Sequence, residues 1–233
     1  MPQLPDPNKY DDPIRFFRDC HALIITLINR LEKLAQEAES KGVKKSIKED
    51  KDWGEILDFL VNDAPLHEQD EEEALFPIVL EKVPHIGFQQ ENSPMRFIQE
   101  QHQVMQLRSI DLLRIWKQTL AKNEISDEDA GKFILGVKEL VGIYREHVRR
   151  ENEIIYTTAN DELLSPQERE EILGKIRELH GKQVISDYLP FDEPTFSLSG
   201  YAPVIVSGEN EDAVSEQTVE LEDDDEENEE EEQ

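Results

Sequence analysis

A repeated His-x-x-x-Glu spacing limits what this chain can fold into. His67 and Glu71 form the first copy, and His147 and Glu151 form the second. In an α-helix, residues four positions apart lie on one face and about 6 Å apart along the axis, so an imidazole and a carboxylate can converge on one point. Both copies therefore predict a helix that presents a metal-binding pair.

The two copies belong to a longer internal repeat. His67 follows His21 by 46 residues, and His147 follows His102 by 45. The stretches that begin at the second and fourth of these histidines, HEQDEEEALFP and HVRRENEIIYT, superpose register by register. The chain thus resembles two copies of one helix hairpin, each with a lone histidine and a His/Glu pair.

Apolar residues at helical spacing predict four long amphipathic helices. They start at Asp12, at about residue 50, at Ser93 and at Ser126, and they end near residues 39, 83, 121 and 155. Asp12 and Ser93 are each followed by proline, which suits the first turn of a helix. We expect Pro65 and Pro77 to bend or interrupt the second helix, and residues 40–46 to form a loop.

Helices joined by short loops favour an all-α, up-down-up-down four-helix bundle, which we assign to residues 12–160. An accessory helix is predicted within 161–181, where Ser165 and Glu168 form a capping box and Gly181 suits the C-terminal end. Prolines and aromatic residues predict an extended segment over 182–206. Residues 207–233 are predicted to be a disordered acidic tail, because they have too little apolar surface to offset the entropy of ordering.

The net charge is −29 over 233 residues, and residues 209–233 contain 15 acidic and no basic side chains. This balance argues against nucleic acid or an anionic membrane as a partner, because both require clustered Lys and Arg. The tail suits a basic protein partner. The apolar runs are too short to span a bilayer, the first residues do not resemble a secretory signal, and Cys20 is the single cysteine, so we expect a cytoplasmic protein.

One histidine falls on each predicted helix, and this changes how each of them is interpreted. A lone histidine on an apolar helix face is usually a core residue that bonds to a carbonyl group or water. Four imidazoles and two carboxylates buried without partners would be costly, whereas a shared pair of metal ions satisfies all six. The predicted metal ligands are therefore His21, His67, Glu71, His102, His147 and Glu151.

The residue types also select among metals. Imidazole with carboxylate suits iron, manganese or zinc, and the lack of a thiolate cluster removes the softer alternatives. Two glutamates that can bridge and four histidines that can be divided favour a dinuclear site. We expect two non-haem iron ions with carboxylate bridges, and rank manganese and zinc behind iron.

The order His, His-x-x-x-Glu, His, His-x-x-x-Glu, with DEE-x-x-LFP after the second histidine, resembles the hemerythrin-like (HHE cation-binding) family of four-helix bundles. The resemblance covers about residues 12–159. It implies that Glu71 and Glu151 bridge the two irons. His21 and His67 would then serve one iron, and His102 and His147 the other.

The chain differs from the oxygen-carrying hemerythrins at two points. They have a further histidine one turn beyond the third-helix ligand, where this chain has Gln106, and their fourth-helix acid lies five residues beyond its histidine instead of four. The four-histidine, two-glutamate set is closer to proteins that repair iron centres under stress. Those carry an additional N-terminal cysteine-bearing domain, which we do not expect from the residues before Asp11.

Three classes of function follow from this resemblance and from the tail. The first is binding or sensing of a small oxidant or diatomic gas (O2, NO or peroxide), or the handling of iron. The second is a diiron enzyme of oxidative or nitrosative stress defence, acting by peroxide or NO reduction or by iron-centre repair, with no catalytic residue assigned. The third is a non-metal interaction protein that uses its acidic tail.

The remaining polar residues near the predicted ligands are given structural interpretations. Tyr144 can hydrogen-bond a ligand of the iron, although a core position suits it better. We expect His85 and His180 at the surface, and Cys20 packed away from the ligand face. Solvated helix faces are predicted for Glu68, Asp70, Glu72, Glu73 and Glu146.

Overall fold

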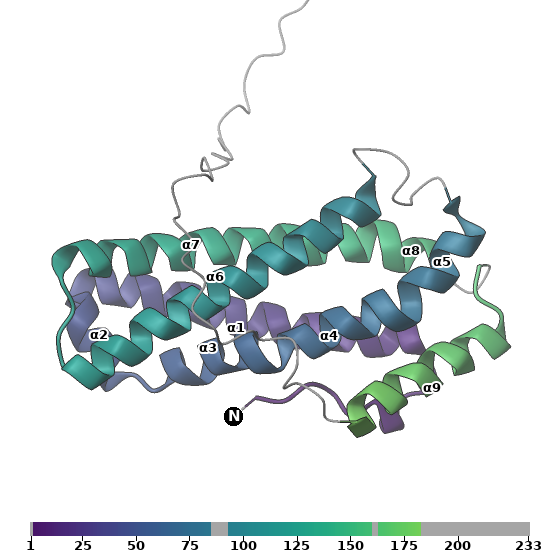
Figure 1. Cartoon of the computed structure of the whole chain (residues 1–233), viewed down its shortest axis with the longest axis horizontal. Helices are drawn as coiled ribbons and strands as arrows, with labels where there is room; N and C mark the ends of the chain where they lie inside the picture. The colour runs from purple at the N-terminus through teal and green to yellow at the C-terminus, as the bar shows by residue number, and fades with distance from the viewer. Residues whose placement is uncertain (1, 85–92, 160–162, 183–233) are drawn as a thin grey trace, which may run out of the picture. The chain divides into compact units, whose positions relative to one another are not determined.

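Four long helical rods lie side by side and form the bundle that the sequence predicts (Figure 1). The computed structural model describes residues 2–84, 93–159 and 163–182, and within these ranges it contains helices and turns but no strand. All of them belong to one unit, Met1–Leu189. The rods are α1 (Pro13–Lys41), α3 followed by α4 (Asp52–Asn62 and Ala64–Asp70), α6 (Pro94–Lys122) and α7 (Asp127–Arg150).

Shorter elements extend or connect these rods. They are the 3-10 turn η1 (Pro7–Lys9), the helices α2 (Val43–Glu49), α5 (Phe76–Lys82), α8 (Tyr156–Thr158) and α9 (Pro166–Lys182), and two π-helical turns, η2 (Glu71–Leu75) and η4 (Glu151–Ile155). No helix in the described ranges combines the length and the apolar character that a membrane crossing requires. Because the described ranges contain helices and turns and no strand, the all-α prediction is confirmed for this part of the chain.

The predicted helix starts are confirmed by their caps. Asp12 accepts a hydrogen bond from the backbone N–H of Ile14 at 3.0 Å, with proline in the first turn. Ser93 accepts one from Arg96 at 3.2 Å. Side-chain oxygens at these positions satisfy N–H groups that have no partner inside the helix, which fixes where these two rods begin, whereas α3 begins after Lys51 without such a cap.

The loop predicted for residues 40–46 is wrong. α1 continues to Lys41, Gly42 makes the turn, and α2 begins at Val43. Gly42 has φ +90°, which a residue with a Cβ rarely adopts, so one glycine replaces a longer loop. Lysines 41, 44 and 45 suggested a polar loop, but Ile47 is buried and attaches α2 to the core.

Pro65 interrupts the second rod just before His67, as predicted. Proline has no N–H to donate, so the helix stops at Asn62 and resumes at Ala64. The rod is interrupted again after Asp70, where the π-helical turn η2 precedes Pro77 in α5. The single helix predicted for residues 50–83 is therefore three α-helices and one wider turn.

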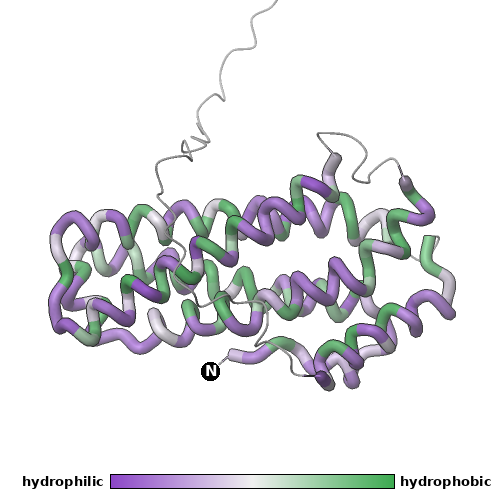
Figure 2. The backbone as a smooth tube through the Cα atoms, viewed as in Figure 1, coloured by the Kyte–Doolittle hydropathy of each residue, from purple (hydrophilic) through white to green (hydrophobic). Residues whose placement is uncertain are grey.

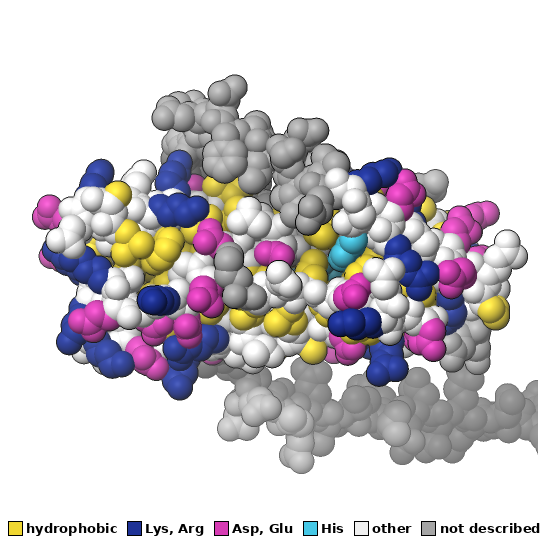
Figure 3. Space-filling model, turned by 90° about the horizontal axis from the view of Figure 1, so that it is seen from below, with side chains coloured by type: hydrophobic (Ala, Val, Ile, Leu, Met, Phe, Trp, Pro, Cys, Tyr) yellow, Lys and Arg dark blue, Asp and Glu magenta, His cyan; other side chains and the backbone are white. Residues whose placement is uncertain are grey.

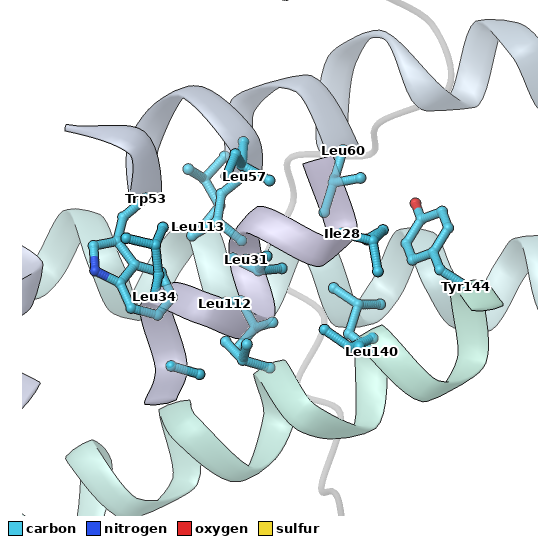
Figure 4. Packing of buried hydrophobic residues seen from close by; sticks show 14 of the residues in the cluster. Ile28, Leu31, Leu34, Trp53, Leu57, Leu60, Leu112, Leu113, Leu140 and Tyr144 are labelled. Carbon is cyan, nitrogen blue, oxygen red and sulfur yellow. The ribbon is translucent and has the colours of Figure 1, made fainter. Parts of the chain in front are cut away.

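Two hydrophobic clusters fill the bundle, and they meet the rods in alternating order. α1 and α6 pass from the second cluster, which contains Phe17 and Ile98, into the first, which contains Ile28 and Leu112. α3–α4 and α7 lie in the first cluster, and the elements that continue them, η2–α5 and η4–α8, lie in the second. This order is that of an up-down-up-down bundle. Figure 2 shows hydrophobic residues recurring along each rod, and Figure 4 shows the first cluster closely packed.

α9 packs beside the ends of α1 and α4 and against η2. It runs from Pro166 to Lys182, one residue beyond Gly181, and its predicted capping box is present, because Glu168 accepts from the Ser165 N–H at 2.8 Å. Buried Ile172 and Ile176 join the second cluster. Nearly all of the predicted segment 182–206, and the whole tail 207–233, lie outside the described residues.

Candidate metal centre

The six predicted ligands come together in one polar layer between the two hydrophobic clusters. The histidines are 2–3% exposed and the glutamates 0%. The structure brings their donor atoms into two groups, each within 4.8 Å, and both groups contain Glu71 and Glu151. The first group is completed by His21 of α1 and His67 of α4, and the second by His102 of α6 and His147 of α7.

In the first group, the imidazole nitrogens surround the ends of the two carboxylates. His21 Nε2 lies 3.0 Å from Glu151 Oε2 and 3.8 Å from Glu71 Oε1. His67 Nε2 lies 3.6 Å from Glu71 Oε1. One oxygen of each glutamate therefore faces the pair of imidazoles on this side.

The second group repeats this arrangement. His102 Nε2 lies 3.5 Å from both Glu71 Oε2 and Glu151 Oε1. His147 Nε2 lies 3.1 Å from Glu151 Oε2 and 3.1 Å from His102 Nε2. The two oxygens of Glu71 are thus divided between the groups, as a bridging carboxylate requires.

The positions of the donor atoms suit binding of metal ions better than hydrogen bonding among the six side chains. His67 Nε2, Glu71 Oε2 and both Glu151 oxygens make no hydrogen bond of normal geometry within the described part of the chain, although they are buried. Two atoms that bind one ion at about 2.1 Å and near a right angle lie about 3.0 Å apart, which matches the shortest distances here. Burying these groups without a shared cation would leave their polar atoms unsatisfied.

Burial affects the four imidazoles differently. It lowers the pKa of His67 well below the usual value, and it also lowers the pKa of His147. Burial acts in the same direction on His21 and His102, but the nearby carboxylates, that of Glu151 foremost, outweigh it and raise the pKa of both. Two imidazoles are therefore held neutral, which is the form that binds metal, and two attract a proton when no cation is bound.

The two glutamates lie close together, but their pKa values are shifted in opposite directions. Burial raises the pKa of Glu71 to about 8, and the charge of Glu151 adds to the effect. Burial also opposes ionisation of Glu151, but the surrounding imidazoles outweigh it and keep the pKa of Glu151 well below the usual value. Such a site attracts cations strongly, because a metal ion offsets the charge that burial makes costly.

The outer nitrogens of the second group have partners that orient the rings. His102 Nδ1 lies 2.7 Å from Glu72 Oε1, and His147 Nδ1 lies 3.3 Å from Gln101 Oε1. An Nδ1–H that donates to an oxygen leaves the lone pair of Nε2 directed into the site. Glu72 was predicted to be on a solvated face, and it is partly exposed, but its carboxylate also positions His102.

The predicted solvated positions of Glu68 and Asp70 are wrong. Glu68 is 4% exposed and accepts a hydrogen bond from Gln106 Nε2 at 2.6 Å. Burial raises its pKa to about 7. Gln106, which stands where the oxygen carriers have another histidine, is thus engaged by an acid from the facing rod. α9 packs against α4 and contacts Asp70.

The surface prediction for His180 is also wrong, because its side chain is only 17% exposed. Its Nε2 lies 2.7 Å from Asp70 Oδ2, which is fully buried. Burial raises the pKa of Asp70 to about 6 although this hydrogen bond opposes the shift. An amphipathic fifth helix indicated that α9 exists, but nothing in its sequence indicated which face of the bundle it covers. His85 lies outside the described residues.

The other assignments follow the predictions. Glu73 is exposed, and Glu146 is partly exposed and paired with Arg149 and Arg150. Cys20 is fully buried in the second cluster. Tyr144 is a core residue whose hydroxyl points into the bundle interior (Figure 4).

Tyr156 was missed as a site residue. Its hydroxyl donates to Glu71 Oε1 and lies 3.3 Å from His21 Nε2. In both π-helical turns, the N–H of the fifth residue beyond the glutamate donates to the carbonyl oxygen of that glutamate. Residues five apart thereby share a face. Tyr156 therefore stacks on His21, and Phe76, which corresponds to Tyr156 in the repeat, stacks on His102. The alignment of these two aromatic residues in the repeat could have indicated from the sequence that Tyr156 lies at the site.

Comparison with known proteins agrees with this geometry. The family model described as hemerythrin HHE cation binding domain matches residues 12–159, which include all four rods and the six clustered side chains. Searches among curated proteins and among solved structures gave no match. Because the family match covers more than half of the chain and contains the buried His/Glu layer, this chain belongs to the hemerythrin HHE cation-binding domain family.

Proposed function

We propose that the protein binds two iron ions and that its function is to bind or sense a small oxidant or diatomic gas (O2, NO or peroxide), or to handle iron. The observation that carries this proposal is the division of the six donors into two groups that share both glutamates. The proposed ligands are His21, His67, Glu71, His102, His147 and Glu151. Their nitrogen and oxygen donors suit iron, with manganese and zinc as alternatives.

When bound, a pair of irons supplies one-electron redox chemistry and coordination positions for a small molecule. The chain supplies the rest. Each rod, together with the elements that continue it, packs into hydrophobic clusters on both sides of the layer, so the donors are preorganised and water is kept from them. Glu72 and Gln101 hold the rings of His102 and His147 with Nε2 inwards. Gln106 bonds to Glu68, and the proposed ligand set therefore contains no fifth histidine.

The alternative proposal is a diiron enzyme in oxidative or nitrosative stress defence. Anaerobically purified, iron-loaded protein is mixed with peroxide or NO in excess, and consumption over many turnovers favours the enzyme. Binding without turnover favours the sensing or binding function.

A basic partner for the acidic tail and a cytoplasmic location also remain proposals that rest on the sequence. On the face seen in Figure 3, basic and acidic side chains are interspersed.

Metal content tests the proposal directly. We expect about two irons per chain after anaerobic purification, and we expect ferrous iron to raise the melting temperature, because a ligand that binds only the folded state stabilises it. His67→Ala removes a donor of the first group and is expected to lose iron and this thermal shift. His180→Ala is the matched control, since it removes an imidazole outside both groups. Iron-free wild-type protein that ferrous iron does not stabilise would rule the proposal out.

A further inference from the structure

The hydroxyl of Tyr156 lies among the donor atoms of the first group. Tyr156 is 1% exposed and follows Glu151 by five residues, so the π-helical turn η4 directs it back over the site. Its oxygen contacts Glu71 Oε1 and lies 3.3 Å from His21 Nε2. The ring stacks on His21 with centroids 5.0 Å apart and on Phe17 at 5.6 Å, and these contacts fix its orientation.

In the metal-free site, this oxygen donates to Glu71 and can accept the Nε2–H of His21, but metal binding removes the second hydrogen bond. A phenol has one proton to donate, and Glu71 receives it. If His21 binds metal through Nε2, that nitrogen has no proton to give, and two lone pairs then face each other at 3.3 Å. A cation bound by both atoms removes this conflict. The 3.3 Å separation is close to the roughly 3.0 Å expected for two donors at right angles on one ion.

We propose that Tyr156 is a seventh protein ligand, binding the metal of the His21/His67 half through its oxygen as a phenolate. This inference rests on the proposed metal binding by the six His and Glu side chains. The phenol proton is released when the metal binds, as protons are from other protein ligands.

Phe76 occupies the equivalent place in the other half and makes the two halves unequal. It stacks on His102 with centroids 6.4 Å apart and planes at 8°, but it has no oxygen to offer. The His21/His67 half therefore has a phenol donor that the His102/His147 half lacks. With fewer protein donors, the His102/His147 half is the one expected to accept a small molecule.

Visible absorption and resonance Raman spectra of the ferric protein test this inference. A phenolate bound to ferric iron gives a charge-transfer band in the visible and enhanced tyrosine ring vibrations, which imidazole and carboxylate ligands do not give. We expect both signals in the wild-type protein and their loss in Tyr156→Phe, with iron content and helicity retained. Tyr144→Phe is the matched control: it removes a hydroxyl from another buried tyrosine and is expected to keep both signals.

The outcomes separate this inference from the proposal on which it rests. Wild-type protein that holds no iron overturns both. Wild-type protein that holds iron but has no visible phenolate band, or a band that Tyr156→Phe leaves unchanged, overturns only the role of Tyr156. If Tyr156→Phe does not fold, wild-type protein grown with ring-deuterated tyrosine decides the question, since the Raman bands must shift if a phenolate binds and must be absent or unshifted if none does.

Discussion

At the scale of single residues, the same type of side chain has different roles at consecutive positions of one helical segment. Glu71, Glu72 and Glu73 are consecutive, yet the first is fully buried between the two donor groups. The second is partly exposed and orients His102, and the third is exposed and lies 3.6 Å from Lys175 of α9. Successive residues of a helical turn point in different directions, so each of these glutamates meets a different environment and composition alone could not distinguish their roles.

Glu72 and Glu73 therefore form a matched pair for mutation. Glu72→Gln weakens the oxygen that receives the Nδ1–H of His102, and such partners of metal ligands typically contribute about 10- to 100-fold to metal affinity. We expect a loss of that size for ferrous iron, measured anaerobically by competition with a chelator. Glu73→Gln changes a neighbouring exposed carboxylate and is expected to leave affinity within about twofold, since exposed ion pairs contribute little. Equal effects of the two variants would contradict a role for Glu72.

At the scale of elements, the α-helical period explains both what the sequence predicted and what it did not. Four amphipathic stripes and their caps predicted the rods, and the spacing of His67 and Glu71 predicted a shared face. Tyr156 was missed because a π-helical turn changes the spacing of residues that share a helix face from four to five, and the local sequence does not indicate that change. Burial of Asp70 and Glu68 was missed for another reason: it depends on where α9 and α6 pack, which is tertiary information.

Gly54 shows how closely two of these elements approach. A Cβ on Gly54 of α3 would lie 2.4 Å from Cη2 of Trp116 in α6. Gly54→Ala must therefore displace a large ring or the helix, which we expect to cost about 1–3 kcal/mol of unfolding free energy despite the better helix propensity of alanine. The free energy of unfolding is measured by denaturant titration.

Gly142 provides the control for this packing argument. It lies in α7, and a Cβ there would meet nothing within 4 Å. Gly142→Ala is expected to stabilise the protein by about 0.5–1 kcal/mol, because alanine favours the helix and restricts the unfolded chain. Destabilisation by both variants to the same degree would show that close contact between α3 and α6 is not what requires glycine at position 54.

At the scale of the whole molecule, the His/Glu layer divides the core of the bundle into two hydrophobic clusters. Every rod, together with the turns and short helices that continue it, contributes apolar residues on both sides of the layer and at least one polar donor within it. Without a cation the layer is held together by protons on some of its groups. With a cation, the same groups join all four rods at one place. Metal affinity and bundle stability are therefore linked.

This linkage gives the affinity for metal a definite pH dependence. Burial raises the pKa of Glu71 to about 8, and hydrogen bonds to carboxylates raise that of His102 against the effect of burial. Their folded-state pKa values lie above the unfolded ones, so proton binding stabilises the metal-free fold at low pH, and this contribution is lost as pH rises through the folded values. His67 and His147 have lowered pKa values and release no proton near neutral pH.

Metal must therefore displace protons between pH 6 and pH 7. They come from Glu71 and His102, from His21, whose pKa is also raised, and from the phenol of Tyr156 where it binds as phenolate. Each displaced proton changes the affinity about tenfold per pH unit, so we expect ferrous iron to bind at least about 10-fold more tightly at pH 7 than at pH 6. The iron-induced rise in melting temperature should be larger at pH 7 for the same reason. Competition with a chelator of known protonation measures the affinity, and melting curves with and without iron measure the stability. An affinity that does not change with pH would mean that protons do not occupy the layer in the absence of metal, and the two rods that carry Glu71 and His102 would then need another source of stabilisation there.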